Sequence, residues 1–222
     1  MCDSSFLFSL GLSLKVAGLS TFMVLIAGTF LAYFLARYEF PGKGILEIAI
    51  FLPLVLPPTV TGYYLVVAFG RNGFLGKLIY EYTGQTVIFS WYGAVIASAV
   101  VALPLMVQTA RAAIESVDQN LIHVSYTLGH SEFTTALRVV LPLAKRGILA
   151  GVTLAFARAM GEFGATLMLA GNIPGRTNTL PLEIYSLTAS GEWARAEYMV
   201  IFFTLVSGLA IFTARRLGKP QI

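Results

Sequence analysis

Few side chains in this 222-residue sequence could do acid–base or nucleophilic chemistry, and they are scattered along the chain. His123 and His130 share one polar stretch, whereas Glu162 is the only carboxylate deep inside an apolar run. Catalysis needs a nucleophile beside a base, or paired carboxylates, within hydrogen-bond reach. The single cysteine, Cys2, excludes an internal disulfide and a cysteine cluster for a metal. The sequence therefore predicts no catalytic residue, no metal site and no enzyme.

The segment nearest to a phosphate-binding loop is GRNGFLGKL, residues 70–78. Its glycine spacing differs from that of a nucleotide-binding loop, and Leu78 stands where a Ser or Thr would hold magnesium. We therefore expect this chain to bind no cofactor and to hydrolyse no ATP by itself.

Arg158 and Glu162 are the one pair of opposite charges inside an apolar run. Their spacing, i and i+4, places both side chains on one face of a helix. Ionised groups in the middle of a membrane cost on the order of 3 kcal/mol each, so they usually face other helices or a water-filled path. Two interpretations stay open: a self-neutralising pair that locks its helix to the neighbours, and a gate whose contacts break and re-form.

Prolines and hydroxyls form a second polar group inside an apolar run. Its members are Pro57, Pro58, Thr59 and Thr61. Prolines remove backbone hydrogen bonds, and a broken helix at membrane depth is tolerated only against protein or water. The group is therefore either a packed kink or the lining of a path. Weak neutral donors suit a path, because an ion must leave as well as enter.

The apolar residues come in blocks that are long enough to cross a bilayer. The chain is 57% hydrophobic and only 12% charged, with mean hydropathy +0.78, far from the composition of soluble domains. A membrane-spanning helix needs about 20 apolar residues. Five blocks qualify, at 7–35, 45–69, 93–114, 148–170 and 196–214. We predict an all-α polytopic membrane protein with five transmembrane helices, formed by one domain over residues 1–222.

The placement of Lys and Arg predicts the orientation of these spans. Nine lie on the side that includes the loop 115–147 and the C-terminus, against four on the other side. Because basic residues accumulate in cytoplasmic loops, we expect the C-terminus in the cytoplasm and the N-terminus outside.

The cytoplasmic loop contains two short amphipathic helices joined at Gly129. Leu121, Val124, Ser125 and Leu128 share one face of the first helix. Ser131 can cap the second, on which Phe133, Ala136, Leu137, Val140 and Leu141 form an apolar stripe while Thr134, Thr135 and Arg138 face away. Pro142 is expected to break this helix from the next span. From the residues alone, the hairpin either lies in the lipid headgroups or docks on a cytoplasmic partner.

A family resemblance favours docking. Gly129, nine residues, Val139 and then Leu141-Pro142 resembles the EAA loop of ABC importer permeases, which carries the helix that couples them to the ATPase. The resemblance implies coupling roles for Ile122, Ser125, Leu128, Gly129, Phe133, Leu137, Leu141 and Pro142. Ile122 stands in place of the glutamate expected at the head of the motif, and Val124 and Ser125 in place of the alanine pair. We therefore expect shape and apolar contact, more than charge, to mediate the docking.

Further segments resemble the permease subunits of molybdate ABC importers over nearly the whole chain. They are FPGKG (40–44), LPLVLPPTVTGY (52–63), TLG (127–129), FARAMGEFGAT (156–166) and GNIPGRTNTLP (171–181). The resemblance implies a type I ABC importer permease fold and an oxyanion cargo. Tungstate and sulfate permeases share much of this pattern, and a polar amino-acid importer subunit is a more distant alternative.

The same resemblance supplies the expected partners. They are cytoplasmic ATPase subunits that carry the ATP and magnesium, an extracytoplasmic oxyanion-binding protein, a second copy of this chain and the lipid bilayer of the inner membrane, with no nucleic acid. It also favours a gate or interface role for Arg158 and Glu162 in alternating access. Gly147 and Gly151 have a small-residue spacing that predicts close helix packing and suits a homodimer.

Overall fold

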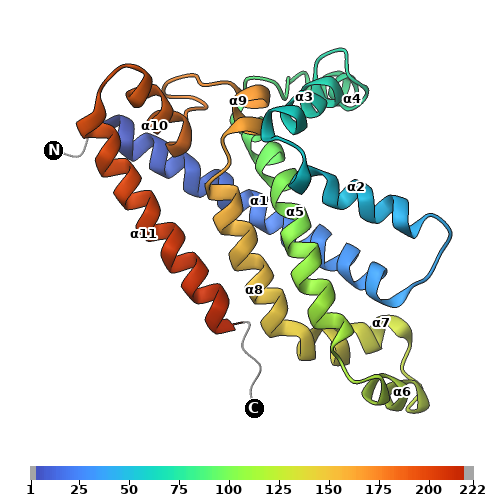
Figure 1. Ribbon diagram of the computed structural model, residues 1–222. Helices are drawn as coiled ribbons and strands as arrows, with labels where there is room; N and C mark the ends of the chain where they lie inside the picture. Colours follow the sequence, from blue (N-terminus) through green and yellow to red (C-terminus); the bar gives the residue numbers. More distant parts are fainter. Residues whose placement is uncertain (1–3, 218–222) are drawn as a thin grey trace.

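The computed structural model describes residues 4–217, and those residues form helices with no strand among them (Figure 1). Four helical segments are long and apolar enough to cross a membrane. They are α1 (Ser4–Arg37), α5 (Trp91–Glu115), the continuous segment Glu132–Met160, and α11 (Trp193–Leu217) over Trp193–Thr213. α5 packs against both α1 and α8 (Leu141–Met160), and α11 packs against α8. The prediction of an all-helical membrane protein is confirmed.

The second expected span, 45–69, is two helices and not one. α2 (Lys43–Val55) has 13 residues and α3 (Pro58–Phe69) has 12, each shorter than a bilayer requires. Leu56, between them, is extended at φ −70° and ψ 144°, as expected for a residue that precedes a proline. The structure therefore has four helical segments long enough to cross a membrane and, over 45–69, two shorter helices in place of the single helix predicted.

A second break divides the expected span 148–170. α8 ends at Met160, and α9 (Gly164–Ala170) begins after three non-helical residues. The two broken regions meet closely: a Cβ built on Gly164 would lie 2.7 Å from Cβ of Pro58, and one built on Gly62 would lie 3.0 Å from Cα of Ala165. α3 and α9 therefore pack almost backbone to backbone, which only glycine permits at these two positions.

Small residues also bring the long helices together. A Cβ built on Gly147 would lie 2.3 Å from Cβ of Ala113, and one built on Gly151 would lie 3.0 Å from Sδ of Met106. The close approach predicted for these two glycines is present, but the partner is α5 of the same chain. This face of α8 is covered within the chain, so it does not supply the expected surface for a second copy.

The short helices lie at opposite ends of the long ones (Figure 1). α6 (Gln119–Thr127), α7 (Glu132–Thr135) and the π-helical turn η1 (Ala136–Val140) lie at one end. α4 (Phe74–Thr83) and α10 (Leu180–Ala189), neither foreseen as a helix, lie at the other end with the start of α1. The hairpin α6–α7 is thus separated from α10 by the full length of the spans.

Candidate functional site

Glycine and capping residues define the hairpin as expected. Gly129 has φ +81°, a left-handed conformation that costs a side-chain-bearing residue energy, although an added Cβ would meet no atom within 4 Å. Asp118 caps α6 by accepting a hydrogen bond from N of Asn120 at 2.8 Å, and Ser131 caps α7 by accepting one from N of Thr134 at 3.3 Å. The predicted turn at Gly129 and the cap at Ser131 are confirmed.

Pro142 does not separate the hairpin from the next span. The chain stays helical from Glu132 to Met160 through one π-helical turn, in which N of Leu141 donates to O of Ala136. Pro142 lies in the first turn of α8. A π-helical turn is wider and shifts the backbone hydrogen bonds by one residue. The helix therefore accommodates the ring of Pro142 and its lack of an N–H without a break. The hairpin is therefore continuous with a candidate membrane span.

The faces of the hairpin differ from the predicted stripe. Phe133 and Leu137 are exposed as part of an outward apolar face, whereas Ala136 and Val140 are buried. Thr135, expected to face away, is fully buried. The other outward-facing apolar side chains are Leu121, Val124 and Leu128.

A contact between two hydroxyl groups explains why Thr135 faces the interior of the hairpin. Oγ of Ser125 lies 2.8 Å from Oγ1 of Thr135 and 3.2 Å from Nδ1 of His130, so α6 and α7 join through small polar groups. A polar pair can be buried at low cost when both partners are satisfied. Ser125 therefore holds the hairpin together instead of facing a partner.

The expected coupling residues divide into support and contact. Ile122 and Ser125 are buried and cannot reach another protein without a rearrangement. Leu128, Phe133 and Leu137 are half or more exposed, at 72%, 72% and 50%. Leu141 is partly covered. Pro142 lines a groove of about 330 Å³ between α6 and the start of α8, with Leu121, Val124, Leu128 and Leu143 among its walls and His130 and Arg138 as polar members.

A polar cluster that the sequence did not reveal ties the hairpin to α1. The carboxylate of Glu132 accepts hydrogen bonds from the hydroxyls of Tyr33 and Tyr126, and one of its oxygens lies 3.9 Å from Nε of Arg37. Arg37 donates to Oε1 of Gln119 at 3.0 Å and to the hydroxyl of Tyr126 at 3.2 Å. Burial raises the pKa of Tyr126, and its hydrogen bond to Glu132 raises that pKa further, so the hydroxyl remains a donor. The only signal in the sequence is the spacing of Tyr33 and Arg37, one helical turn apart.

Some residues at the break between α2 and α3 are exposed, and others are buried. Pro57, Pro58 and Thr59 are exposed on the surface of the chain. Thr61 is buried, and its Oγ1 has no hydrogen-bond partner in the described part of the chain. The same holds for Oγ1 of Thr166. Unpaired buried hydroxyls are uncommon in folded proteins.

Arg158 and Glu162 form an ion pair across the second break. Nη1 of Arg158 lies 2.8 Å from Oε2 of Glu162, and Oε1 of Glu162 accepts a hydrogen bond from N of Ala165 at 2.8 Å. The two residues do not share one helix, because α8 ends before Glu162. The Glu162 side chain is 1% exposed and that of Arg158 is 28% exposed.

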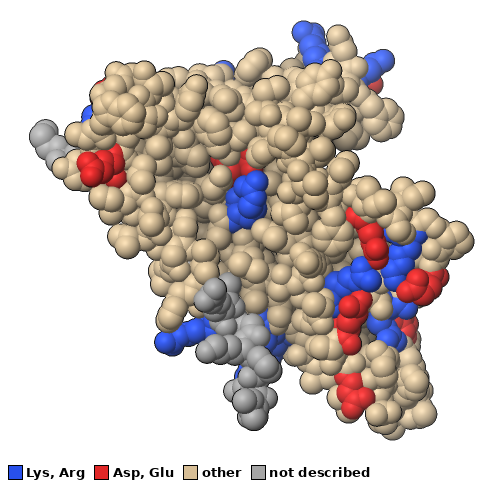
Figure 2. Space-filling view, viewed as in Figure 1, with Lys and Arg blue, Asp and Glu red and all other residues tan. Residues whose placement is uncertain are grey.

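The surroundings of this pair are apolar. Figure 2 shows one basic and one acidic patch within an otherwise uncharged band of the surface, over the upper end of α8. Glu162 therefore fixes the geometry of the break, while Arg158 reaches the surface.

Four long apolar helices, two interrupted helical regions and a helical hairpin at one end characterise the described residues. The sequence model of the binding-protein-dependent transport system inner membrane component family matches residues 25–219. The chain belongs to this family.

Similar proteins cover nearly the whole chain. The molybdenum transport system permease protein ModB of Escherichia coli (strain K12) is 46% identical over 87% of this chain and 86% of its own length. ModB of Haemophilus influenzae is 43% identical over 95% and 93% of the two chains. The putative molybdenum transport system permease protein YvgM of Bacillus subtilis (strain 168) is 44% identical over 94% and 92%.

Solved structures agree in fold. A bacterial ABC transporter involved in the import of alginate superimposes with a TM-score of 0.75, at 17% identity, over 98% of this chain and 81% of that chain. An amino acid ABC transporter gives a TM-score of 0.63, at 17% identity, over 96% and 94%. The fold is that of type I ABC importer permeases, as the sequence predicted.

Proposed function

We propose that this chain is the transmembrane permease subunit of an ATP-driven importer that translocates molybdate across the inner membrane by alternating access. The single observation that carries the transport role is the hairpin: an outward apolar face on α6 and α7, continuous with the span α8. The similarity to molybdenum transport permeases over most of the chain supports the choice of cargo.

The energy comes from a separate subunit. Cytoplasmic ATPase subunits dock on Leu128, Phe133 and Leu137, and they hold the ATP and magnesium that this chain does not bind. Nucleotide-driven closure moves the hairpin, and the unbroken helix through η1 passes the movement to α8. With the hairpin in the cytoplasm, we infer that the C-terminus is also in the cytoplasm and that the N-terminus is outside.

The path lies between this chain and a second copy. The exposed side of the α2–α3 break, with Pro57, Pro58 and Thr59, faces it, and Arg158 stands beside it. Freed backbone groups and neutral hydroxyls are weak ligands, which suits an anion that must both enter and leave. Selectivity then belongs largely to an extracytoplasmic binding protein that delivers the anion.

Reconstitution tests the proposal directly. The permease is incorporated into liposomes with its partner ATPase and binding protein, and the ATP hydrolysis rate is measured with molybdate, tungstate and sulfate in turn. We expect stimulation by the binding protein loaded with molybdate, together with accumulation of molybdate in the vesicles. Stimulation by sulfate alone would identify sulfate, and not molybdate, as the cargo. No stimulation by any of the three anions would contradict the proposal of an oxyanion importer.

A further inference from the structure

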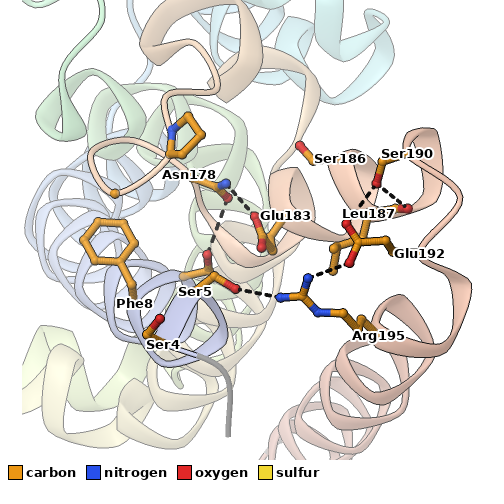
Figure 3. A pocket seen from close by; sticks show the side chains of 13 residues that line it. Ser4, Ser5, Phe8, Asn178, Glu183, Ser186, Leu187, Ser190, Glu192 and Arg195 are labelled. Atoms are coloured by element: carbon orange, nitrogen blue, oxygen red, sulfur yellow. Dashed lines mark hydrogen bonds and ion pairs between the residues drawn. The ribbon is translucent and has the colours of Figure 1, made fainter.

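An open cavity of about 600 Å³ lies at the end of the molecule opposite to the hairpin, where the start of α1, the loop before α10, and α10 meet the start of α11 (Figure 3). Its walls combine serine hydroxyls, an amide, two carboxylates and a guanidinium with apolar side chains. The members that matter are Ser4, Phe8, Asn178, Glu183, Leu187 and Glu192. The proposed pathway and the hairpin use none of them.

Glu183 is the unusual member of this cavity. It is only 8% exposed, and its Oε2 accepts a hydrogen bond from Nδ2 of Asn178 at 2.6 Å. Oδ1 of Asn178 in turn lies 3.4 Å from Oγ of Ser9. Within the described residues, no Lys, Arg or His comes within ion-pair distance of Glu183, and its Oε1 has no hydrogen bond. A carboxylate at 8% exposure with no cation beside it is a suitable acceptor for an incoming positive charge.

The second carboxylate of the cavity differs because it is already neutralised. Oε2 of Glu192 lies 2.5 Å from Nη1 of Arg195, and Nη2 of the same guanidinium lies 3.4 Å from Oγ of Ser5. Figure 3 shows this pair on the α11 side of the cavity, away from the contact between Asn178 and Glu183. Among the described residues that line the cavity, Glu183 is therefore the carboxylate with no paired cation.

The shape of the cavity selects the kind of cation. Phe8 and Leu187 provide an apolar wall, and the cavity is much larger than one ion needs, since a water molecule occupies about 30 Å³ in the liquid. A metal would need several oxygen or nitrogen ligands, and no group of three or more His, Cys, Asp or Glu occurs in the described residues. A lysine or arginine side chain fits both features, because its aliphatic stem packs on apolar groups while its charged end reaches an acceptor.

We propose that this cavity is a socket for a lysine or arginine side chain of the extracytoplasmic binding protein, with Glu183 as the acceptor. The proposal rests on the proposed function, which places this end of the molecule outside the cell. On docking, the incoming cation supplies the charge that Glu183 lacks, and Phe8 and Leu187 cover its stem. The socket is thus completed only in the complex with the binding protein.

The test measures docking and not transport alone. Full transporter with its ATPase is placed in lipid nanodiscs, and the Kd for molybdate-loaded binding protein is measured for wild type, Glu183→Gln and Ser4→Trp. Glu183→Gln removes the negative charge but keeps a side chain of the same shape, which can still accept the hydrogen bond from the amide of Asn178. We expect docking roughly tenfold or more weaker, because loss of one partner of a buried charge pair speeds dissociation. The Kd of this variant should also depend less on salt than that of wild type.

Ser4→Trp and a charge control make the test decisive. Ser4 is exposed at the mouth of the cavity, so tryptophan blocks entry and leaves the contact between Asn178 and Glu183 in place. This variant decides the matter if Glu183→Gln fails to assemble. Glu81→Gln removes a charge at the same end, where Glu81 is exposed beside Lys77 at 3.9 Å, and should dock as wild type.

The outcomes separate the two proposals. The concentration of binding protein for half-maximal ATPase stimulation should rise in the socket variants while the maximal rate stays unchanged. Wild-type docking by either Ser4→Trp or an assembled Glu183→Gln would refute the socket and leave the importer proposal intact. Failure of the wild-type transporter to dock any loaded binding protein would instead count against the importer proposal.

Discussion

Glu162 uses both of its carboxylate oxygens to hold the break between α8 and α9. One oxygen pairs with Arg158 and the other accepts from the backbone N–H of Ala165. The two interpretations that the sequence left open, a lock and a gate, therefore fall on different residues. Glu162 is buried and locks the geometry, whereas the more exposed Arg158 is able to change partners.

We predict that Arg158→Ala and Glu162→Ala each impair assembly more than the double substitution does. Arg158→Ala strands the buried carboxylate of Glu162, at a cost of about 3 kcal/mol, and Glu162→Ala leaves the guanidinium of Arg158 unpaired in an apolar band, whereas the double change leaves neither charge. The double variant still loses the cap on Ala165, worth about 1 kcal/mol. The yield of folded protein in mild detergent measures the difference. Equal yields for all three variants, with transport intact, would show that the pair is not needed.

The hairpin α6–α7 is an element whose rigidity depends on one backbone conformation. Gly129 has the left-handed φ that joins α6 to α7, and the Ser125–Thr135 contact then fixes the two helices against each other. Because no atom lies near the Cβ position, a substitution at Gly129 strains the backbone without a steric clash. The effect of such a substitution is therefore confined to the turn.

We predict that Gly129→Val leaves the spans folded but uncouples transport from ATP hydrolysis. A non-glycine residue in this conformation costs about 1–2 kcal/mol, which displaces α7 and the exposed Phe133. Pull-down of the ATPase over a salt series and uptake of molybdate measure the loss. For wild type, we expect docking to depend weakly on salt, because its contact face is apolar.

Gly42→Val is the matched control for this prediction. Gly42 has φ +89° with open space around it and lies outside the hairpin, before α2. This variant introduces a similar backbone strain but leaves the hairpin unchanged. It should therefore retain the coupling of transport to ATP hydrolysis. If Gly129→Val also retains transport and binds the ATPase as wild type does, the hairpin is only an interfacial helix.

The cluster around Glu132 attaches the hairpin α6–α7 to α1 as well. We predict that Tyr33→Phe and Glu132→Gln reduce ATPase stimulation by loaded binding protein several-fold while the ATPase still binds. Each change weakens a hydrogen bond to a charged group, worth about 1.5–3 kcal/mol, without altering the outward face of the hairpin. Glu115→Gln removes a charge that pairs with Arg111 at 2.7 Å and should leave stimulation unchanged. Loss of ATPase binding in the Tyr33 variant would assign the cluster to docking instead.

Periodicity and turn residues predicted the elements well where local preferences decide. The long apolar runs became α1, α5 and α11, and Gly129 and Ser131 shaped the hairpin as expected. The interruptions were harder to predict. Prolines at 57 and 58 broke one span, whereas Pro142 was absorbed by a π-helical turn, because the outcome depends on neighbours that only the folded chain supplies.

The candidate site shows the same division. The spacing of Arg158 and Glu162 correctly indicated a pair, but not that a helix ends between them. The burial of Ile122 and Thr135, and the cavity around Glu183, depend on contacts between segments distant in sequence. No local pattern could have revealed them.

At the scale of the whole molecule, orientation in the membrane remains the decisive prediction. We expect the N-terminus outside, so a membrane-impermeant maleimide added to intact spheroplasts should label Cys2, the only thiol of the chain. Cys2 lies outside the described residues. Labelling is compared before and after permeabilisation, so that sidedness and not rate is measured. A signal that requires permeabilisation would invert the topology and place the Glu183 cavity in the cytoplasm.

The mutual packing of the two broken helices has a consequence for biosynthesis. The break before Pro58 leaves polar backbone groups that lipid cannot satisfy, and its partner at Gly164 lies about a hundred residues later in the chain. At a synthesis rate of roughly 5–20 residues per second, the segment that packs on the first break is made on the order of 5–20 s later. During that interval the first break must be held by the insertion machinery or by a chaperone, not released into lipid. A chain truncated before residue 164 should therefore be recognised by membrane quality control and degraded, however apolar its completed spans are.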